Sequence, residues 1–220
     1  MIWNFGDLII ISISLVYTSR FNQITDKIKL YIESNKTHSN VLSIYSVEIE
    51  KIRDKFWRDL RRDYGQMYQM CTSSSDLFGL LILITYSFNM MFILVQLFVS
   101  LRPREQIIEI LYFVSSFSFV VGRTVMSSIY GGWLDEAGKA ALPILNAVPS
   151  EMYTEEVAMF IAQIQNNSPT LSGYNFFNIT KGLVLSIAAS IITYELVLMQ
   201  FNQQELDQYL SVKGNVTICY

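Results

Sequence analysis

The chain has 220 residues, of which 51% are hydrophobic and only 16% are charged, and its mean hydropathy is +0.32. Soluble domains carry about 25% charged residues, so this composition excludes an ordinary water-soluble protein and indicates a membrane protein. The net charge of −3 is uninformative, because it sums over segments on two sides of a membrane.

Four apolar runs are candidates for membrane-spanning helices: residues 2–17, 77–101, 107–130 and 182–201. The last run has 20 residues, and at about 1.5 Å per residue it spans roughly 30 Å, the thickness of the hydrocarbon core of a bilayer. The first run is the weakest candidate, because it is short and contains Asp7. We therefore expect an all-α membrane protein with four transmembrane helices, at residues 1–19, 76–101, 107–130 and 181–202.

The basic residues predict the orientation of these helices. Ten of the 16 lie between Arg20 and Arg62, and lysine and arginine are enriched in short cytoplasmic loops. Residues 20–75 and 131–180 are therefore expected in the cytoplasm, whereas the turn 102–106 and the tail 203–220 are expected outside the cell. The sequon Asn215-Val216-Thr217 then makes Asn215 a candidate for N-glycosylation.

Two amphipathic helices are predicted in the cytoplasmic segments. The first carries an apolar stripe, made of Ile49, Ile52, Phe56, Leu60 and Met67, and we expect it to continue into the second span. The second is expected after Ser150, which would cap it, with an apolar side made of Tyr153, Val157, Phe160, Ile161 and Ile164. Gly131-Gly132 is expected to break the third span at its inner end.

The sequence gives little sign of enzyme chemistry. His38 is the single histidine and lies in a polar segment, without a Cys, His or carboxylate cluster at zinc spacing around it. The chain has no G-x-S-x-G, Walker A or G-x-G-x-x-G motif. We expect neither catalysis nor a cofactor or metal site, and no nucleic-acid partner.

The last apolar run has one small, polar face. At 100° per residue, five side chains lie within roughly 60° of their mean direction, namely Ser186, Ser190, Thr193, Val197 and Gln200. Such a face in a membrane helix indicates either close helix packing or the lining of an ion path. Glu195 points about 160° away from Val197, so it is expected to be buried against other helices. Arg123 is expected to stretch toward it or to snorkel toward the cytoplasm.

Short motifs along the chain resemble one known family. Thr193-Tyr194, five mostly apolar residues and then Gln200-Phe201 resemble the signature of the last helix of insect gustatory receptors, which are relatives of the insect odorant receptors. Four further segments are similar to the sugar-receptor branch: residues 50–60, Gly122-Arg123-Thr124, Val148-Pro149-Ser150 and Leu171-Ser172-Gly173. The order and spacing of these motifs carry the resemblance over most of the chain.

The resemblance implies a seven-helix receptor-channel subunit, of which this chain resembles the carboxy-terminal half, with its spans as the fourth to seventh helices. It implies a sugar-gated, nonselective cation channel in the plasma membrane of gustatory sensory neurons, formed as a homo- or heterotetramer in the lipid bilayer. In the family the last helix lines the pore, with the position of Val197 at the constriction and that of Gln200 facing the ions. Cytoplasmic helices pack the subunits around the axis, and the alternative is that they lie on the inner leaflet.

Two other function classes stay open. A truncated or regulatory subunit would join other receptor subunits without conducting ions. A transporter would normally show repeated halves or Gly- or Pro-broken helices near the midplane, and neither is apparent.

Sugar recognition needs polar groups that bind hydroxyls beside an aromatic face in a partly enclosed cavity. The resemblance implies a pocket in the outer half of the helical bundle. The polar and aromatic residues at the outer ends of the spans are Trp3, Asp7, Asn89, Gln96, Glu109 and Tyr112. We expect these six residues, as a set, to bind the sugar.

Overall fold

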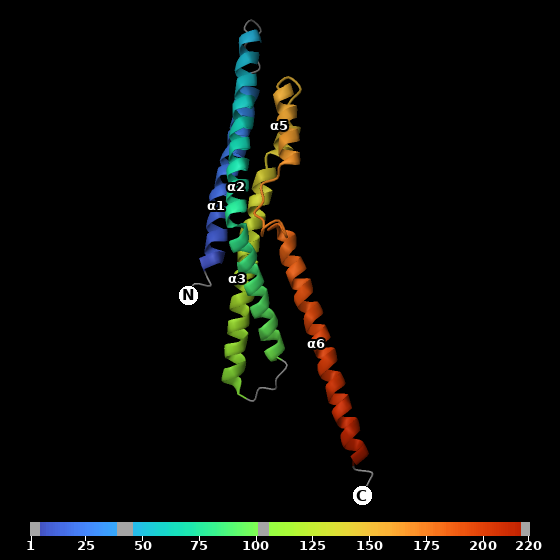
Figure 1. Ribbon diagram of the computed structural model, residues 1–220. Helices are drawn as coiled ribbons and strands as arrows, with labels where there is room; N and C mark the ends of the chain where they lie inside the picture. Colours follow the sequence, from blue (N-terminus) through green and yellow to red (C-terminus); the bar gives the residue numbers. More distant parts are fainter. Residues whose placement is uncertain (1–4, 39–45, 101–105, 217–220) are drawn as a thin grey trace.

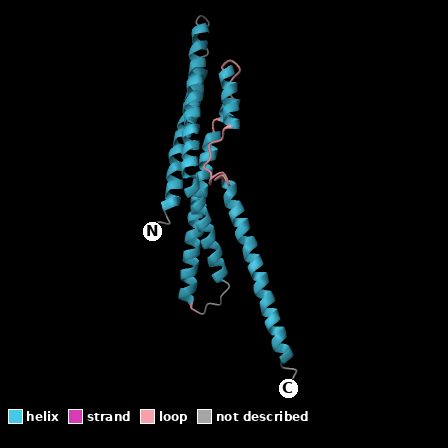
Figure 2. Cartoon of the chain, viewed as in Figure 1, coloured by secondary structure: helices cyan, strands magenta, loops and turns pink. Residues whose placement is uncertain are grey.

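A computed structural model describes residues 5–38, 46–100 and 106–216 (Figure 1). This part of the chain forms the helices α1 (Phe5–His38), α2 (Ser46–Ser100), α3 (Ile107–Lys139), α4 (Leu142–Asn146), α5 (Glu155–Asn166) and α6 (Lys181–Val216). Helices joined by short loops account for almost all of it (Figure 2), and its one β-type pairing is an isolated bridge between Ser172 and Asn178. The expected all-α fold is therefore confirmed for the described residues.

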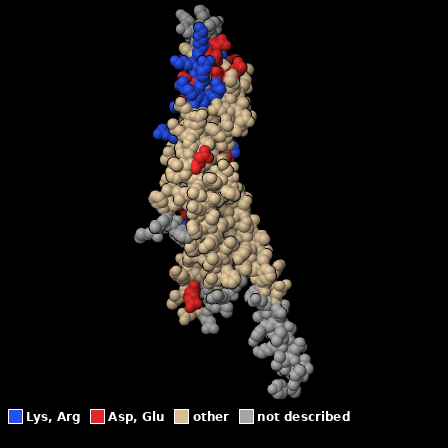
Figure 3. All heavy atoms as spheres, in the orientation of Figure 1, with Lys and Arg blue, Asp and Glu red and all other residues tan. Residues whose placement is uncertain are grey.

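Three long helices form a bundle and the last helix leaves it. α1 and α2 run antiparallel to each other, α3 lies along both, and α6 diverges from the middle of the bundle (Figure 1). Lysine and arginine side chains gather at the end where α2 begins, and the opposite half of the molecule is almost free of them on the face shown in Figure 3. This segregation of charge is what the predicted cytoplasmic and membrane segments require.

Three helices are long and apolar enough to cross a membrane, in the ranges Glu50–Val99, Ile107–Asn146 and Lys181–Phe201. They contain the second, third and fourth expected spans. Among the described residues α1 does not reach this threshold, although its 34 residues give it a length of about 50 Å. The apolar first part of α1 and the polar remainder form one unbroken helix, so the expected boundary near residue 19 lies inside a helix.

The first part of α2, which is predicted to be cytoplasmic, continues into the second expected span without a break, as expected. Its buried stripe differs from the predicted one, however, because Ile52 is 63% exposed while Trp57, Leu60 and Tyr64 are buried. The stripe shifts because α2 is covered from two sides. Phe21 of α1 and Phe160 of α5 both contact Tyr64, with ring centroids 5.3 and 5.5 Å from its own.

α5 packs against α2 instead of lying on the inner leaflet. Val157, Phe160 and Ile164 are fully buried, so protein covers the apolar side that a lipid surface would otherwise cover. The helix begins at Glu155 with Thr154 in the capping position, and the prediction that Ser150 caps it is wrong because residues 150–153 form a turn. Tyr153 therefore lies outside the helix and is half exposed, contrary to the predicted apolar side.

Gly131-Gly132 does not break the third span, which is a further correction. α3 continues through both glycines to Lys139, and both are buried. A methyl group on Gly131 would collide with Ile179, and one on Gly132 would lie 2.8 Å from the backbone nitrogen of Lys181. The glycines are needed because the segment that starts α6 crosses α3 at this point.

Candidate functional site

The candidate pore face on α6 is uncovered in this structure. Within residues 181–201 only Ile187 is buried. The hydroxyl groups of the face donate to carbonyl oxygens one turn earlier, from Ser186 to Gly182 at 3.3 Å, from Ser190 to Ser186 at 2.9 Å and from Thr193 to Ala189 at 2.8 Å. Each hydroxyl donor is satisfied by its own helix, and the oxygen lone pairs stay available to an aqueous or ionic partner.

Val197 and Gln200 extend the candidate pore face toward the end of the expected span. Val197 is 41% exposed, and Gln200 is exposed one turn further on. Leu196 and Met199 are exposed as well, so exposure in a single chain does not distinguish the predicted lumen side from a lipid side. The pore-lining role of the five residues stays a prediction.

A buried polar cluster joins the first three helices. The guanidinium Nε of Arg123 on α3 lies 2.8 Å from Oδ2 of Asp7 on α1, and Arg123 also donates to Oδ1 of Asn89 on α2. The Asn89 side-chain nitrogen lies 3.2 Å from Oδ1 of Asp7. Asp7 and Asn89 are 2% and 0% exposed, and the charges of Asp7 and Arg123 are paired with each other within the bundle, as buried charges require.

This cluster corrects the expectations for Arg123. Its side chain neither snorkels toward the cytoplasm nor turns to Glu195, because Asp7 and Asn89 hold it within the bundle. Glu195 is only half buried on α6. The cluster also assigns the polar atoms of Asp7 and Asn89 to one another and to Arg123, and their sugar-binding role stays a prediction.

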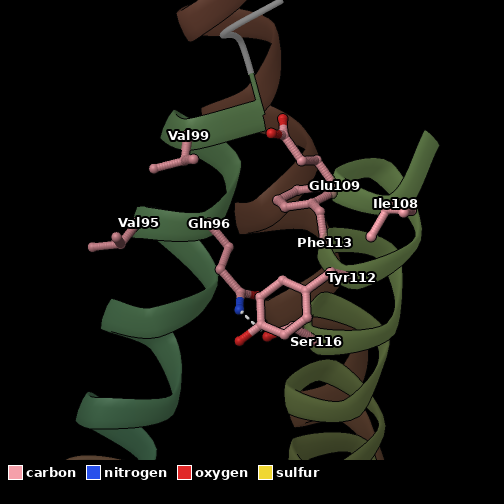
Figure 4. Close-up of a pocket in the computed structure, with 8 residues that line it drawn as sticks. All are labelled: Val95, Gln96, Val99, Ile108, Glu109, Tyr112, Phe113 and Ser116. Atoms are coloured by element: carbon pink, nitrogen blue, oxygen red, sulfur yellow. Dashed lines mark hydrogen bonds between the residues drawn. The ribbon is translucent and has the colours of Figure 1, made fainter. Parts of the chain in front are cut away.

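Three of the other proposed sugar-binding residues line one cavity. It lies between the outer parts of α2 and α3 and has a volume of about 520 Å³ (Figure 4). Its lining consists of Val95, Gln96, Val99, Ile108, Glu109, Tyr112, Phe113 and Ser116. The structure thus brings Gln96, Glu109 and Tyr112 together, separates them from the Asp7 cluster and leaves Trp3 outside the described residues.

The cavity combines hydrogen-bonding groups with aromatic surface. Gln96 donates to the Ser116 hydroxyl at 2.8 Å, and Tyr112 lies beside this pair (Figure 4). The Gln96 carbonyl oxygen is buried and has no hydrogen-bond partner within the described part of the chain, and an acceptor of this kind is costly unless a ligand or water satisfies it. The cavity therefore offers a few hydrogen-bonding groups and an aromatic ring within a mostly apolar lining.

Ser116 was missed by reasoning from the sequence alone. The signal was present, because Glu109, Tyr112 and Ser116 follow one another at spacings of three and four residues and therefore lie on one side of a helix. Among the described residues no group of three or more metal-ligating side chains comes together. The side chain of Asn215 is outside the described ones, and its glycosylation stays a prediction.

Comparisons with known proteins agree on one family. The chain matches the profile of the trehalose receptor family over residues 1–209. It is 31% identical over 202 residues to "Gustatory receptor for sugar taste 64f" of Drosophila melanogaster, which covers 92% of this chain and 40% of the relative. It is 28% identical over 152 residues to "Gustatory receptor 5a for trehalose" of the same species, which covers 69% of this chain and 34% of the relative. The chain therefore spans less than half the length of these relatives.

A solved structure shares the fold. The insect olfactory receptor OR5 from Machilis hrabei, in complex with eugenol, superimposes with a TM-score of 0.63 at 12% identity, over 89% of this chain and 47% of that chain. At this identity the similarity shows a common fold and nothing about the ligand.

Proposed function

Because the chain belongs to the trehalose receptor family of insect sugar gustatory receptors, we propose that it forms part of a sugar-gated, nonselective cation channel in the plasma membrane of gustatory sensory neurons. Four subunits, alike or different, surround one central pore. The observation that carries this proposal is the uncovered hydroxyl face of α6, which the bundle of its own chain leaves open.

The chemistry of that face suits a gated cation path. With α6 of each subunit around a common axis, Ser186, Ser190 and Thr193 supply hydroxyl oxygens to passing ions. Val197 forms an apolar ring that closes the path by dewetting, and the Gln200 amides, three residues away and so about 4.5 Å along the axis, replace part of the hydration shell of a cation.

The cavity between α2 and α3 supports the sugar-binding part of the proposal. Its Gln96 carbonyl oxygen is an unpaired acceptor, Ser116 and Glu109 are further hydrogen-bonding groups, and Tyr112 offers a ring face. A sugar presents hydroxyl donors and acceptors around apolar C–H faces, so its hydroxyl groups would bind to the few polar groups and its C–H faces would pack on the apolar and aromatic remainder of the lining.

α3 connects the two sites physically. Its outer part carries Tyr112 and Ser116, and its inner part holds the start of α6 through Gly132 and through a 2.6 Å ion pair between Glu136 and Lys181. A shift of α3 on sugar binding therefore moves the base of the pore helix. Coupling of this kind needs only one rigid element that contacts both sites.

The test uses a chimera in which this chain replaces the matching segment of the Drosophila sugar taste receptor 64f, expressed in cells and recorded with a panel of mono- and disaccharides. We expect a sugar-dependent cation current. Gln96→Leu should raise the half-maximal sugar concentration by about tenfold, the effect of one lost hydrogen bond, whereas Phe98→Leu, on an exposed position of the same helix, should not. A current that is unaffected by Gln96→Leu would exclude the cavity, and a chimera that reaches the cell surface without any current would exclude the channel.

A further inference from the structure

We propose that an inner-leaflet phospholipid with a serine headgroup binds in a groove between α1 and α2. The groove has a volume of about 520 Å³, and its lining changes character along its length. Val16 and Met70 are apolar, and Arg20, Gln23, Lys27 and Asp63 are polar or charged. Such a gradient matches a molecule with an acyl chain at one end and a charged headgroup at the other.

With the orientation predicted from the basic residues, contacts along the helices put the groove at the cytoplasmic surface of the membrane. The Tyr17 hydroxyl donates to the Met70 carbonyl oxygen at 3.1 Å and lies 2.7 Å from the Ser74 hydroxyl, so the three residues share one level. The next residue, Ser75, accepts a 2.9 Å hydrogen bond from the backbone of Ser172, in the loop that leads into α6. This level is the inner end of the apolar segments of α2 and α6, and Arg20 lies one turn below it on α1.

Among the described residues, most of the other basic residues have a carboxylate partner, whereas the basic residues of the groove do not. Arg53, Arg58, Arg61, Arg62, Lys29, Lys139 and Lys181 each have a carboxylate within 4 Å. Arg20 is exposed and contacts Gln23 at 3.3 Å, and neither it nor Lys27 has a carboxylate partner within the described part of the chain. Two cations at the membrane surface that have no carboxylate partner attract anionic lipid.

The charges in the groove select among the anionic headgroups. A phosphatidylserine headgroup carries a phosphate, a carboxylate and an ammonium group, and the groove offers two cations, Arg20 and Lys27, and one anion, Asp63. We assign the phosphate to Arg20, which lies closest to the membrane, and the carboxylate and ammonium to Lys27 and Asp63 further along. A glycerol headgroup lacks the ammonium group and leaves Asp63 as a repulsive neighbour.

Native mass spectrometry of the full 220-residue chain, released from detergent micelles with equal amounts of synthetic phosphatidylserine, phosphatidylglycerol and phosphatidylcholine, tests the assignment. We expect phosphatidylserine adducts to exceed both others. Arg20→Gln and Lys27→Gln should each weaken phosphatidylserine binding by about fivefold, the usual effect of one basic residue at a membrane surface. Lys29→Gln is the control, because it removes the same charge two residues after Lys27. Lys29 pairs with Asp26, so this change should leave phosphatidylserine binding unaltered.

Two further arms identify the lipid and its headgroup. Met70→Gln should weaken binding of phosphatidylserine but not of soluble glycerophosphoserine, and Asp63→Asn should remove the preference for phosphatidylserine over phosphatidylglycerol. Equal retention of phosphatidylserine and phosphatidylcholine, or equal losses in Arg20→Gln and Lys29→Gln, would overturn the site. Equal retention of phosphatidylserine and phosphatidylglycerol by the unchanged chain would overturn the serine headgroup. Circular dichroism of each variant confirms that it is folded.

Discussion

The part of the molecule predicted to be cytoplasmic and the part predicted to span the membrane differ in how many polar side chains they bury. In the predicted cytoplasmic part most buried residues are apolar or aromatic, with Trp57, Tyr64 and Phe160 among them. Between the predicted spans the buried set includes Asp7, Asn89 and a group of hydroxyl residues, Thr85, Thr124, Ser127 and Ser128, while large apolar side chains are exposed on α2, α3 and α6.

This difference follows from the two solvents. Water drives apolar surface inward, which favours the burial of Trp57, Tyr64 and Phe160 in the predicted cytoplasmic part of the hydrophobic core. Lipid gives no such driving force, and polar groups that it cannot hydrate are satisfied inside the bundle instead. The Tyr86 hydroxyl, for example, lies 2.8 Å from that of Ser128. α6 differs, because its hydroxyl groups face outward and donate to carbonyl oxygens of their own helix.

The cytoplasmic core should show the largest loss of stability. Phe160→Ala leaves a cavity beside Tyr64 and should lower the free energy of unfolding by about 3–5 kcal/mol, measured by chemical denaturation in detergent with circular dichroism. Phe176→Ala removes the same ring from a position that is 76% exposed and should cost little. If the two variants are equally stable, Phe160 is not part of a packed core.

The buried cluster of Asp7, Asn89 and Arg123 should show the next largest loss of stability. Asp7→Asn leaves the Arg123 guanidinium without its charge partner, and breaking a buried pair costs about 3–5 kcal/mol in soluble proteins, with smaller values expected in a membrane. The double variant Asp7→Asn, Arg123→Gln should recover part of the loss in a thermal unfolding assay. Additive losses from the two changes would show that the residues do not act as a pair.

A pair of glycines on α3 tests the contact that positions α6. Gly131→Ala forces the methyl group against Ile179 and should destabilise by about 1–3 kcal/mol, as overpacking does. Gly122→Ala is the matched control, because no atom lies within 4 Å of its methyl position, and the change should stabilise the helix by up to about 1 kcal/mol. If Gly131→Ala and Gly122→Ala change the stability in the same direction, α6 is not held against α3.

The smallest expected effect is a pH dependence in the cytoplasmic part. Burial raises the pKa of Tyr31 above its ordinary value of 10.0, where its ring stacks on that of Phe56 at 3.8 Å. The unfolded chain therefore loses this proton first as the pH rises past 10, so the stability that the neutral phenol contributes is present below that pH and declines above it. Tyr31→Phe should flatten the decline in melting temperature above pH 10, and parallel curves for the two proteins would contradict the shift.

Apolar runs in the sequence predicted the three helices that are long and apolar enough to cross a membrane, because such a run lies within one helix. Contacts between helices that are far apart in the sequence were harder to predict. Trp57 is buried beside Tyr31 of α1, and Gly131-Gly132 leaves room for Ile179 and Lys181 instead of ending the helix. Arg123 was misassigned for the same reason, since its partner Asp7 comes from a helix 116 residues away in sequence. Gln96, Glu109 and Tyr112 could be singled out because polar and aromatic residues at the ends of apolar runs stand out individually; they line one cavity, and their sugar-binding role stays a prediction.

The most direct test of the channel proposal is cysteine accessibility on α6 in an assembled receptor, such as the chimera with the sugar taste receptor 64f. Single cysteines at Leu196, Val197, Met199 and Gln200 are exposed to a charged thiol reagent while sugar holds the channel open. Leu196 and Met199 are turned about 100° and 200° away from Val197 and are matched controls, since all four are exposed in the single chain. We predict modification and block of the current at Val197 and Gln200 only. Equal block at all four positions, or block only at Leu196 and Met199, would contradict the assignment of this face to a pore.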